Sequence, residues 1–168
     1  MNNKNKFYIK NLDINKKYYK CSYIVLENKL KIVLKLVKKY LKEESIENLH
    51  QLRIAVRKLR YVMEIFSGCY NKKEFIKAYK KVKFLQDELG KGRDYDVLIE
   101  KLKSLNEINF NTIKEKFEIE KENIRQTIKK ELIKFVEEKN EFNFLINKKW
   151  GSYETKIFLT FSIFNNIK

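Results

Sequence analysis

The chain has 168 residues, a net charge of +16 at neutral pH, and 43% hydrophobic residues. This length suits one domain with a hydrophobic core, and the apolar fraction excludes an intrinsically disordered chain. With no proline, four glycines and abundant Lys, Glu, Leu and Ile, the composition favours long helices, while the charge points to nucleic acid, polyphosphate or an acidic membrane surface as partner.

Helical periodicity runs through most of the chain and predicts an all-α fold, a helical bundle of long antiparallel helices. Residues 1–21 form a polar N-terminal arm, and the apolar segment 151–168 packs either on the bundle or on a second subunit. Between them lies the bundle, residues 22–150, with helices predicted at about 22–43, 46–67, 72–89, 112–139 and 141–150, and a further helix that begins near Asp94.

Capping residues are predicted around the second and third helices. Ser45 is an N-cap for the helix that starts at residue 46, and Gly68 is a C′ residue that ends it. Asn71, with Glu74 three residues later, is similar to a capping box at the start of the third helix.

The glycines Gly90 and Gly92 predict a structural turn after the third helix. Asp94 would cap the helix that follows, and Asp96 would lie in its first turn, where negative charge suits the helix dipole. Arg93 either joins the backbone amides of this helix start in an anion site or pairs with a nearby aspartate. The pairing is favoured, because two aspartates would repel an anion.

The segment from His50 to Arg60 holds the only histidine and three of the five arginines of the chain. At about 100° per residue, His50, Arg53, Arg57 and Arg60 fall within an arc of roughly 80° on one side of a helix. The opposite side carries the apolar residues of an amphipathic helix: Leu52, Ala55, Val56, Leu59, Val62, Met63 and Phe66.

Two interpretations of this basic side remain open. A solvated face, or arginines paired with carboxylates of a neighbouring helix, would need no ligand. An anionic ligand is favoured, because arginine binds phosphate through two parallel hydrogen bonds and is scarce in this lysine-rich chain. His50 would bind such a ligand better when protonated. Further basic residues would add looser contacts: Lys58, Lys77, Lys80, Lys81 and Lys83.

The pattern His-x-x-Arg-x-x-x-Arg-Lys-x-Arg over residues 50–60, followed by Leu-Gly-x-x-Arg-Asp-x-Asp-Val over residues 89–97, resembles the CHAD family of conserved-histidine α-helical domains. The similarity extends over residues 22–150. It implies a helical domain that binds inorganic polyphosphate through a basic surface or pore and has no catalytic activity. By position, the family's histidine falls on His50, its basic residues on Arg53, Arg57, Lys58 and Arg60, and its turn residues on Arg93, Asp94 and Asp96.

The chain departs from the family pattern in one respect. CHAD domains typically contain two similar bundles and a second histidine–arginine helix, whereas this chain has one such helix. Either two copies form a homodimer in which two His50 helices face one channel, or the gene product is truncated. The homodimer is favoured, because the apolar tail needs a partner.

Other functions have less support in the residues. A nucleic-acid-binding protein would use the same arginines, but no helix-turn-helix, zinc or RRM-like pattern is present and no exposed aromatic platform is expected. An enzyme of phosphoryl chemistry would need a Walker loop or clustered metal-binding carboxylates, so we expect no catalytic residue, metal or cofactor. A helical adaptor for an acidic protein is the remaining alternative.

The cysteines and the termini bear on the location of the protein. Cys21 and Cys69 are far apart and are expected to be reduced. We find no signal peptide and no apolar run of membrane-spanning length, and therefore expect a cytoplasmic protein without membrane contact. Association with polyphosphate granules is one role left open, beside storage and sensing.

Overall fold

The computed structural model describes residues 9, 12–13, 15–104 and 110–146. Four long helices dominate this part: α1 (Tyr18–Lys42), α2 (Ile46–Ile65), α3 (Lys72–Ser104) and α4 (Phe110–Glu137). Three short helical segments complete it: η1 (Ser67–Cys69), η2 (Glu138–Phe142) and α5 (Asn143–Ile146). The predicted all-α fold is confirmed, and the described residues contain no strand.

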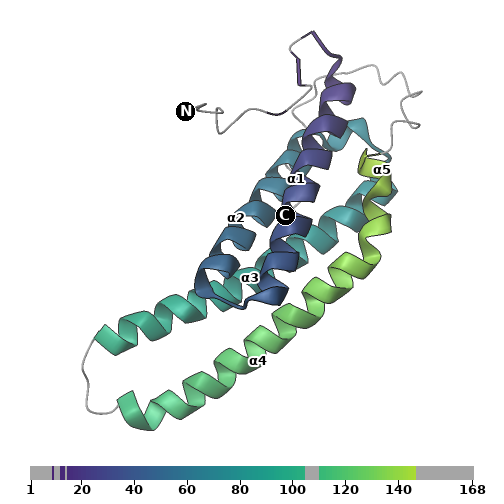
Figure 1. The fold of residues 1–168 in the computed structure, drawn as a ribbon. Coiled ribbons are helices and arrows are strands. Elements are labelled where there is room, and N and C mark those ends of the chain that lie inside the picture. The colour runs from purple at the N-terminus through teal and green to yellow at the C-terminus, as the bar shows by residue number, and fades with distance from the viewer. Residues whose placement is uncertain (1–8, 10–11, 14, 105–109, 147–168) are drawn as a thin grey trace, which may run out of the picture.

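The helices follow one another as antiparallel neighbours (Figure 1). α2 packs against both α1 and α3, α4 returns along α3, and α5 lies beside α1. With 33 and 28 residues, α3 and α4 are longer than the other two helices and continue as a pair beyond the connection between α1 and α2. The compact bundle therefore includes only part of the α3–α4 pair.

One hydrophobic core joins the four helices. Burying a Val, Leu, Ile or Phe side chain contributes about 1.5–3 kcal/mol, so these contacts hold the bundle together. The core residues come from every long helix and from the segment after α4: Leu26, Val33, Val37, Leu52, Val56, Leu59, Val82, Leu85, Leu89, Ile128, Leu132, Phe135, Phe142 and Leu145.

Two of the predicted caps are confirmed. The Oγ of Ser45 accepts a hydrogen bond of 3.2 Å from the backbone N–H of Asn48, which caps α2. The Oδ1 of Asn71 accepts from the backbone N–H groups of Lys73 and Glu74 at 3.0 and 3.4 Å, which caps α3. The prediction for Gly68 is wrong: α2 ends at Ile65, and the chain tightens into η1 without a left-handed glycine.

The predicted turn at Gly90 and Gly92 is also wrong. α3 continues from Lys72 to Ser104, so the expected helices at 72–89 and after Asp94 are one helix. Asp94 and Asp96 therefore lie within this helix and do not cap its start, and no helix N-terminus is available there for an anion. Packing of α3 along α4 outweighs the low helix propensity of the two glycines.

Other boundaries differ in smaller ways. α1 begins at Tyr18, so residues 18–21 of the predicted arm are helical, and the helix expected at 141–150 is described only up to Ile146. The predicted tail 151–168 lies outside the described residues. Both cysteines are free thiols. None of the described helices has the length and hydropathy needed to cross a membrane.

Candidate functional site

The two sides of α2 differ in burial as the amphipathic pattern predicts. Arg57 and Lys58 are exposed, while His50, Arg53 and Arg60 are half-buried. Partial burial makes a cationic group lose hydration, so an unpaired half-buried arginine is costly unless an anion binds to it. The apolar side is buried in the core: Leu49, Leu52, Ala55, Val56, Leu59 and Met63.

Two contacts establish how α2 and α3 are aligned. The Tyr79 hydroxyl donates a hydrogen bond of 2.6 Å to Glu64 at one end. At the other end, a Cβ added at Gly92 would lie 3.3 Å from a methyl of Leu49. Antiparallel helices advance by the same rise per residue in opposite directions, so the positions between these contacts face one another in order.

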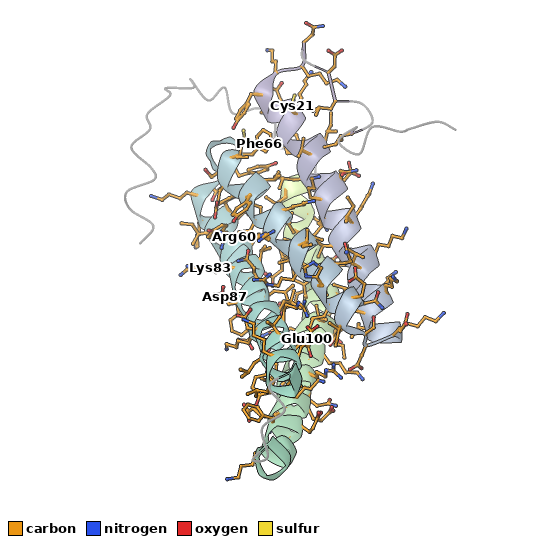
Figure 2. All side chains as sticks on the ribbon, turned by 90° about the vertical axis from the view of Figure 1, so that its left-hand side faces the viewer. Cys21, Arg60, Phe66, Lys83, Asp87 and Glu100 are labelled. Atoms are coloured by element: carbon orange, nitrogen blue, oxygen red, sulfur yellow. The ribbon has the colours of Figure 1, made fainter. Side chains whose placement is uncertain are left out.

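This register brings the basic side of α2 against one side of α3. Equal rise along the two helices places Arg60, Arg57, Arg53 and His50 level with Lys83, Gln86, Gly90 and Arg93 in turn. Figure 2 is seen from this side, with Arg60 of α2 next to Lys83 and Asp87 of α3. We name the whole set the α2–α3 seam: His50, Arg53, Arg57 and Arg60 with Lys83, Gln86, Gly90 and Arg93.

Arg60 is held at one end of the seam by Glu64 and Tyr61, and Tyr79 in turn holds Glu64. Its Nε lies 3.2 Å from Glu64 Oε1, an ion pair without hydrogen-bond geometry. Its guanidinium carbon lies 5.0 Å from the ring centre of Tyr61. Burial and the hydrogen bond to Glu64 raise the pKa of Tyr79 to about 12, so its hydroxyl stays a donor to that carboxylate. Arg60 is therefore fixed in position and partly neutralised.

The remaining cations of the seam lack such partners. In the part of the chain that the structure describes, no carboxylate forms an ion pair with Arg53, Arg57 or Arg93. The predicted pairing of Arg93 with a nearby aspartate is therefore not found there. Among the described residues, the buried Nδ1 of His50 and the buried Oε1 of Gln86 also find no hydrogen-bond partner, although Oε1 is an acceptor and cannot donate to an anion. Since most buried polar atoms are hydrogen-bonded, these unsatisfied groups mark the seam as a candidate binding site.

Carboxylates do not balance the charge of the seam. Asp87 and Asp94 are exposed on α3 near the seam, and Glu64 is engaged by Arg60 and Tyr79. These three anions are fewer than the six cations of the same region: Arg53, Arg57, Lys58, Arg60, Lys83 and Arg93.

The four lysines predicted from α3 do not share one side of the helix. Lys77 pairs with Glu141 at 3.1 Å, and Lys81 pairs with both Glu138 and Glu141 of η2. These two lysines join α3 to the segment after α4 and lie away from the seam. Lys83 belongs to the seam, and Lys80 is exposed beside it.

Asp96 lies between α3 and α4, a position that the sequence did not predict. Its side chain is 2% exposed and faces α4, where Lys121 Nζ and Arg125 Nη2 lie 3.8 and 3.7 Å from its Oδ1. Neither cation was among the predicted site residues. Arg125 is the fifth arginine, so the scarcity that singled out the other four applied to it as well. Its pairing with Asp96 links α3 to α4.

Two aromatic side chains on α2 and α3 are exposed, and they bear on the expectation that the chain has no exposed aromatic platform. Tyr61 of α2 is 46% exposed and Phe84 of α3 is 50% exposed. The guanidinium carbon of Arg60 lies 5.0 Å from the centre of the Tyr61 ring. Phe84 follows Lys83 in the sequence, but neighbouring residues of a helix point in different directions.

Comparison with known protein families identifies one family whose model matches three of the four long helices. The family model described as the CHAD domain matches residues 17–103, which include α1, α2 and almost all of α3. The matched region contains every residue of the α2–α3 seam. No curated protein and no solved structure matches the chain significantly.

Proposed function

This chain belongs to the CHAD domain family, and we propose that it binds inorganic polyphosphate at the α2–α3 seam without catalysing a reaction. The observation that carries the proposal is a set of three arginines without an ion-pair partner in the described part of the chain, Arg53, Arg57 and Arg93, of which two are half-buried. The Nδ1 of His50 likewise has no hydrogen-bond partner there. Family membership supports polyphosphate as the anion.

The spacing of the seam suits a linear polyanion. From Arg60 to His50 the helix rises by about 15 Å, so its cations form a row and not a single point site. Like charges one turn apart on a helix repel by about 0.2–0.5 kcal/mol per pair, and a bound phosphate chain would remove this repulsion. Each guanidinium can hold two phosphate oxygens at once, whereas lysine acts as a point charge.

The lysines would contribute unequally to binding. Lys58, Lys80 and Lys83 have no carboxylate partner in the described residues and are exposed, so a ligand can recruit them directly. Lys77 and Lys81 would first have to leave Glu141 and Glu138. We therefore expect Lys77→Gln and Lys81→Gln to change the affinity less than Arg57→Gln does.

A competition titration tests the proposed ligand. Labelled long-chain polyphosphate is bound at about 0.15 M salt, where weak surface electrostatics are screened, and displaced by unlabelled polyphosphate or duplex DNA at equal phosphate concentration. We expect polyphosphate to displace the label at a far lower concentration than DNA does. Equal displacement would mean that the protein responds only to charge density.

Charge-removal variants test the site itself. Arg53→Gln and Arg57→Gln together should weaken binding and reduce the dependence of the affinity on salt, because fewer counterions are released. Lys38→Gln, on an exposed position of α1, is the matched control that removes a charge elsewhere. If this control weakens binding as strongly per charge as the arginine variants do, the seam is not the binding site.

Single-stranded nucleic acid is the second candidate, favoured by the exposed rings of Tyr61 and Phe84. Stacking of a base on an aromatic side chain contributes about 1–3 kcal/mol. Replacing both rings by leucine should then weaken the binding of an oligonucleotide tenfold or more while the affinity for polyphosphate stays the same. A preference for oligonucleotide over polyphosphate that depends on both rings would favour this second function.

The assembly belongs to the same proposal. With one His50 helix per chain, a two-fold symmetric homodimer would supply the second basic helix expected of the family. Light scattering coupled to size-exclusion chromatography measures the mass directly, and a monomer at micromolar concentration contradicts the homodimer. Colocalisation of the tagged protein with polyphosphate granules tests the cellular role.

A further inference from the structure

Two glycines of α3 have different surroundings although they are only two residues apart. A Cβ at Gly92 would lie 2.5 Å from Ile128 and 3.3 Å from Leu49, so close packing explains the absence of a side chain there. A Cβ at Gly90 would meet no atom within 4 Å. Neither glycine has a left-handed backbone. Packing therefore requires glycine at position 92 but not at position 90, and backbone conformation requires it at neither.

Gly90 also weakens the helix that contains it. Glycine is the least favourable residue in a helix interior apart from proline, and Gly90 lies in the middle of α3. Alanine would fit the available space and would stabilise the helix. Within the described residues, neither packing, backbone conformation nor helix propensity accounts for glycine at this position.

The position of Gly90 within the seam offers an explanation that involves a ligand. The α2–α3 register places it opposite Arg53 and between Gln86 and Arg93. Arg53 of α2 and Arg93 of α3 form no ion pair within the described residues. Gln86 can donate to an anion only through its Nε2, because its buried Oε1 is an acceptor. The open space at Gly90 thus lies among groups that can bind an anion.

We propose that the missing side chain of Gly90 makes room for one phosphate of a bound chain, and that Gly90 thereby selects a thin linear polyphosphate over duplex nucleic acid. This inference rests on the proposed function. A polyphosphate chain has no substituents, so it can lie between α2 and α3 and contact arginines of both helices. Duplex DNA carries its phosphates on a broad cylinder and would reach only outward-facing residues such as Arg57 and Lys58.

Three variants of the 168-residue chain test the inference. Gly90→Ala and Gly90→Leu fill the space without changing charge. Gly68→Ala is the matched control, since Gly68 also has no atom within 4 Å of an added Cβ and lies in η1, beyond the end of the seam. The affinities for long-chain polyphosphate and for duplex DNA are measured in parallel at one salt concentration.

We expect Gly90→Leu to weaken polyphosphate binding about tenfold or more, which corresponds to about 1.4 kcal/mol. Gly90→Ala should weaken it less, although this variant should raise the thermal unfolding midpoint by about 2–4 °C. The affinity for duplex DNA should change less than that for polyphosphate in both variants. Gly68→Ala should leave both affinities unchanged.

Gly90→Ala should be more stable than the wild type, so a loss of polyphosphate binding in this variant cannot result from unfolding. Gly90→Ala therefore tests the role of Gly90 even if Gly90→Leu does not fold. Unchanged polyphosphate affinity in Gly90→Ala and Gly90→Leu would overturn the role of Gly90 and leave the proposed function standing. Equal losses for polyphosphate and DNA would overturn the selectivity. A wild-type protein that does not bind polyphosphate would overturn the proposed function and this inference with it.

Discussion

Replacing Gly92 by alanine is the sharpest test of how α3 packs against α2 and α4. The new methyl carbon would lie 2.5 Å from Ile128 Cδ1 and 3.3 Å from Leu49 Cδ2. Ile128 is completely buried and Leu49 is 2% exposed, so neither side chain can move into solvent. The substitution therefore forces a rearrangement inside the core.

Comparison with the same substitution at Gly90 isolates the contribution of packing to the free energy of unfolding. Both variants gain up to about 1 kcal/mol of helix propensity, and this gain cancels when they are compared. Overpacking a core typically costs about 1–3 kcal/mol. We therefore expect Gly90→Ala to raise the free energy of unfolding by up to about 1 kcal/mol and Gly92→Ala to lower it by about 1 kcal/mol.

Urea unfolding followed by circular dichroism at the helix band measures both free energies. A second-site variant tests the named contact, because Ile128→Val removes the Cδ1 atom that the new methyl would meet. Alone, Ile128→Val should lower the free energy of unfolding by about 0.5–1.5 kcal/mol. Combined with Gly92→Ala, the loss should be smaller than the two single losses together by about 1 kcal/mol.

Two results would refute this reasoning. If Gly92→Ala is as stable as Gly90→Ala, the close approach of α3 and α4 at this position does not exist in solution. If the losses of Gly92→Ala and Ile128→Val are simply additive, the two positions do not touch, and the glycine must have another explanation.

Further variants test other contacts. Asp96→Asn should lower the free energy of unfolding by about 2 kcal/mol, because it leaves two partly buried cations of α4 without their carboxylate; equal stability in urea unfolding would show that this pair is unimportant. The wild type should lose stability between about pH 10 and about pH 12, because an unfolded tyrosine ionises near 10 whereas Tyr79 keeps its proton in the folded state until about 12. Tyr79→Phe should reduce this alkaline loss, and an identical pH profile would contradict the raised pKa. Ser45→Ala removes the acceptor for the N–H of Asn48 and should lower the thermal midpoint by about 2–4 °C, corresponding to about 1 kcal/mol; an unchanged midpoint would mean that water replaces the cap.

Local patterns in the sequence predicted the parts of this protein that depend on residues close together in the chain. The 3.6-residue period of α2 separates Leu52 and Val56 from Arg53 and Arg57, and the burial follows that division. Ser45 and Asn71 cap the helices as expected, because a cap needs only a side chain and backbone amides two or three residues later.

The same local reasoning was wrong at the two glycines. A glycine pair between predicted helices usually marks a turn, and the low helix propensity of glycine opposes a continuous helix. Contacts of α3 with α2 and α4 outweigh that cost, and they involve residues such as Leu49 and Ile128, which lie tens of positions away in the chain. No local pattern contains such contacts.

The chain alone determined that the protein is helical, where α2 begins, and which of its residues form a basic row, because these features follow from helix geometry and local hydrogen bonds. Only the tertiary structure decided which cations are already neutralised. Lys81 and Arg125 look no different in sequence from Lys83 and Arg53, yet their helices bring Glu138 and Asp96 against them. Whether a charge is free to bind a ligand depends on its neighbours in space, and packing between distant helices selects those neighbours.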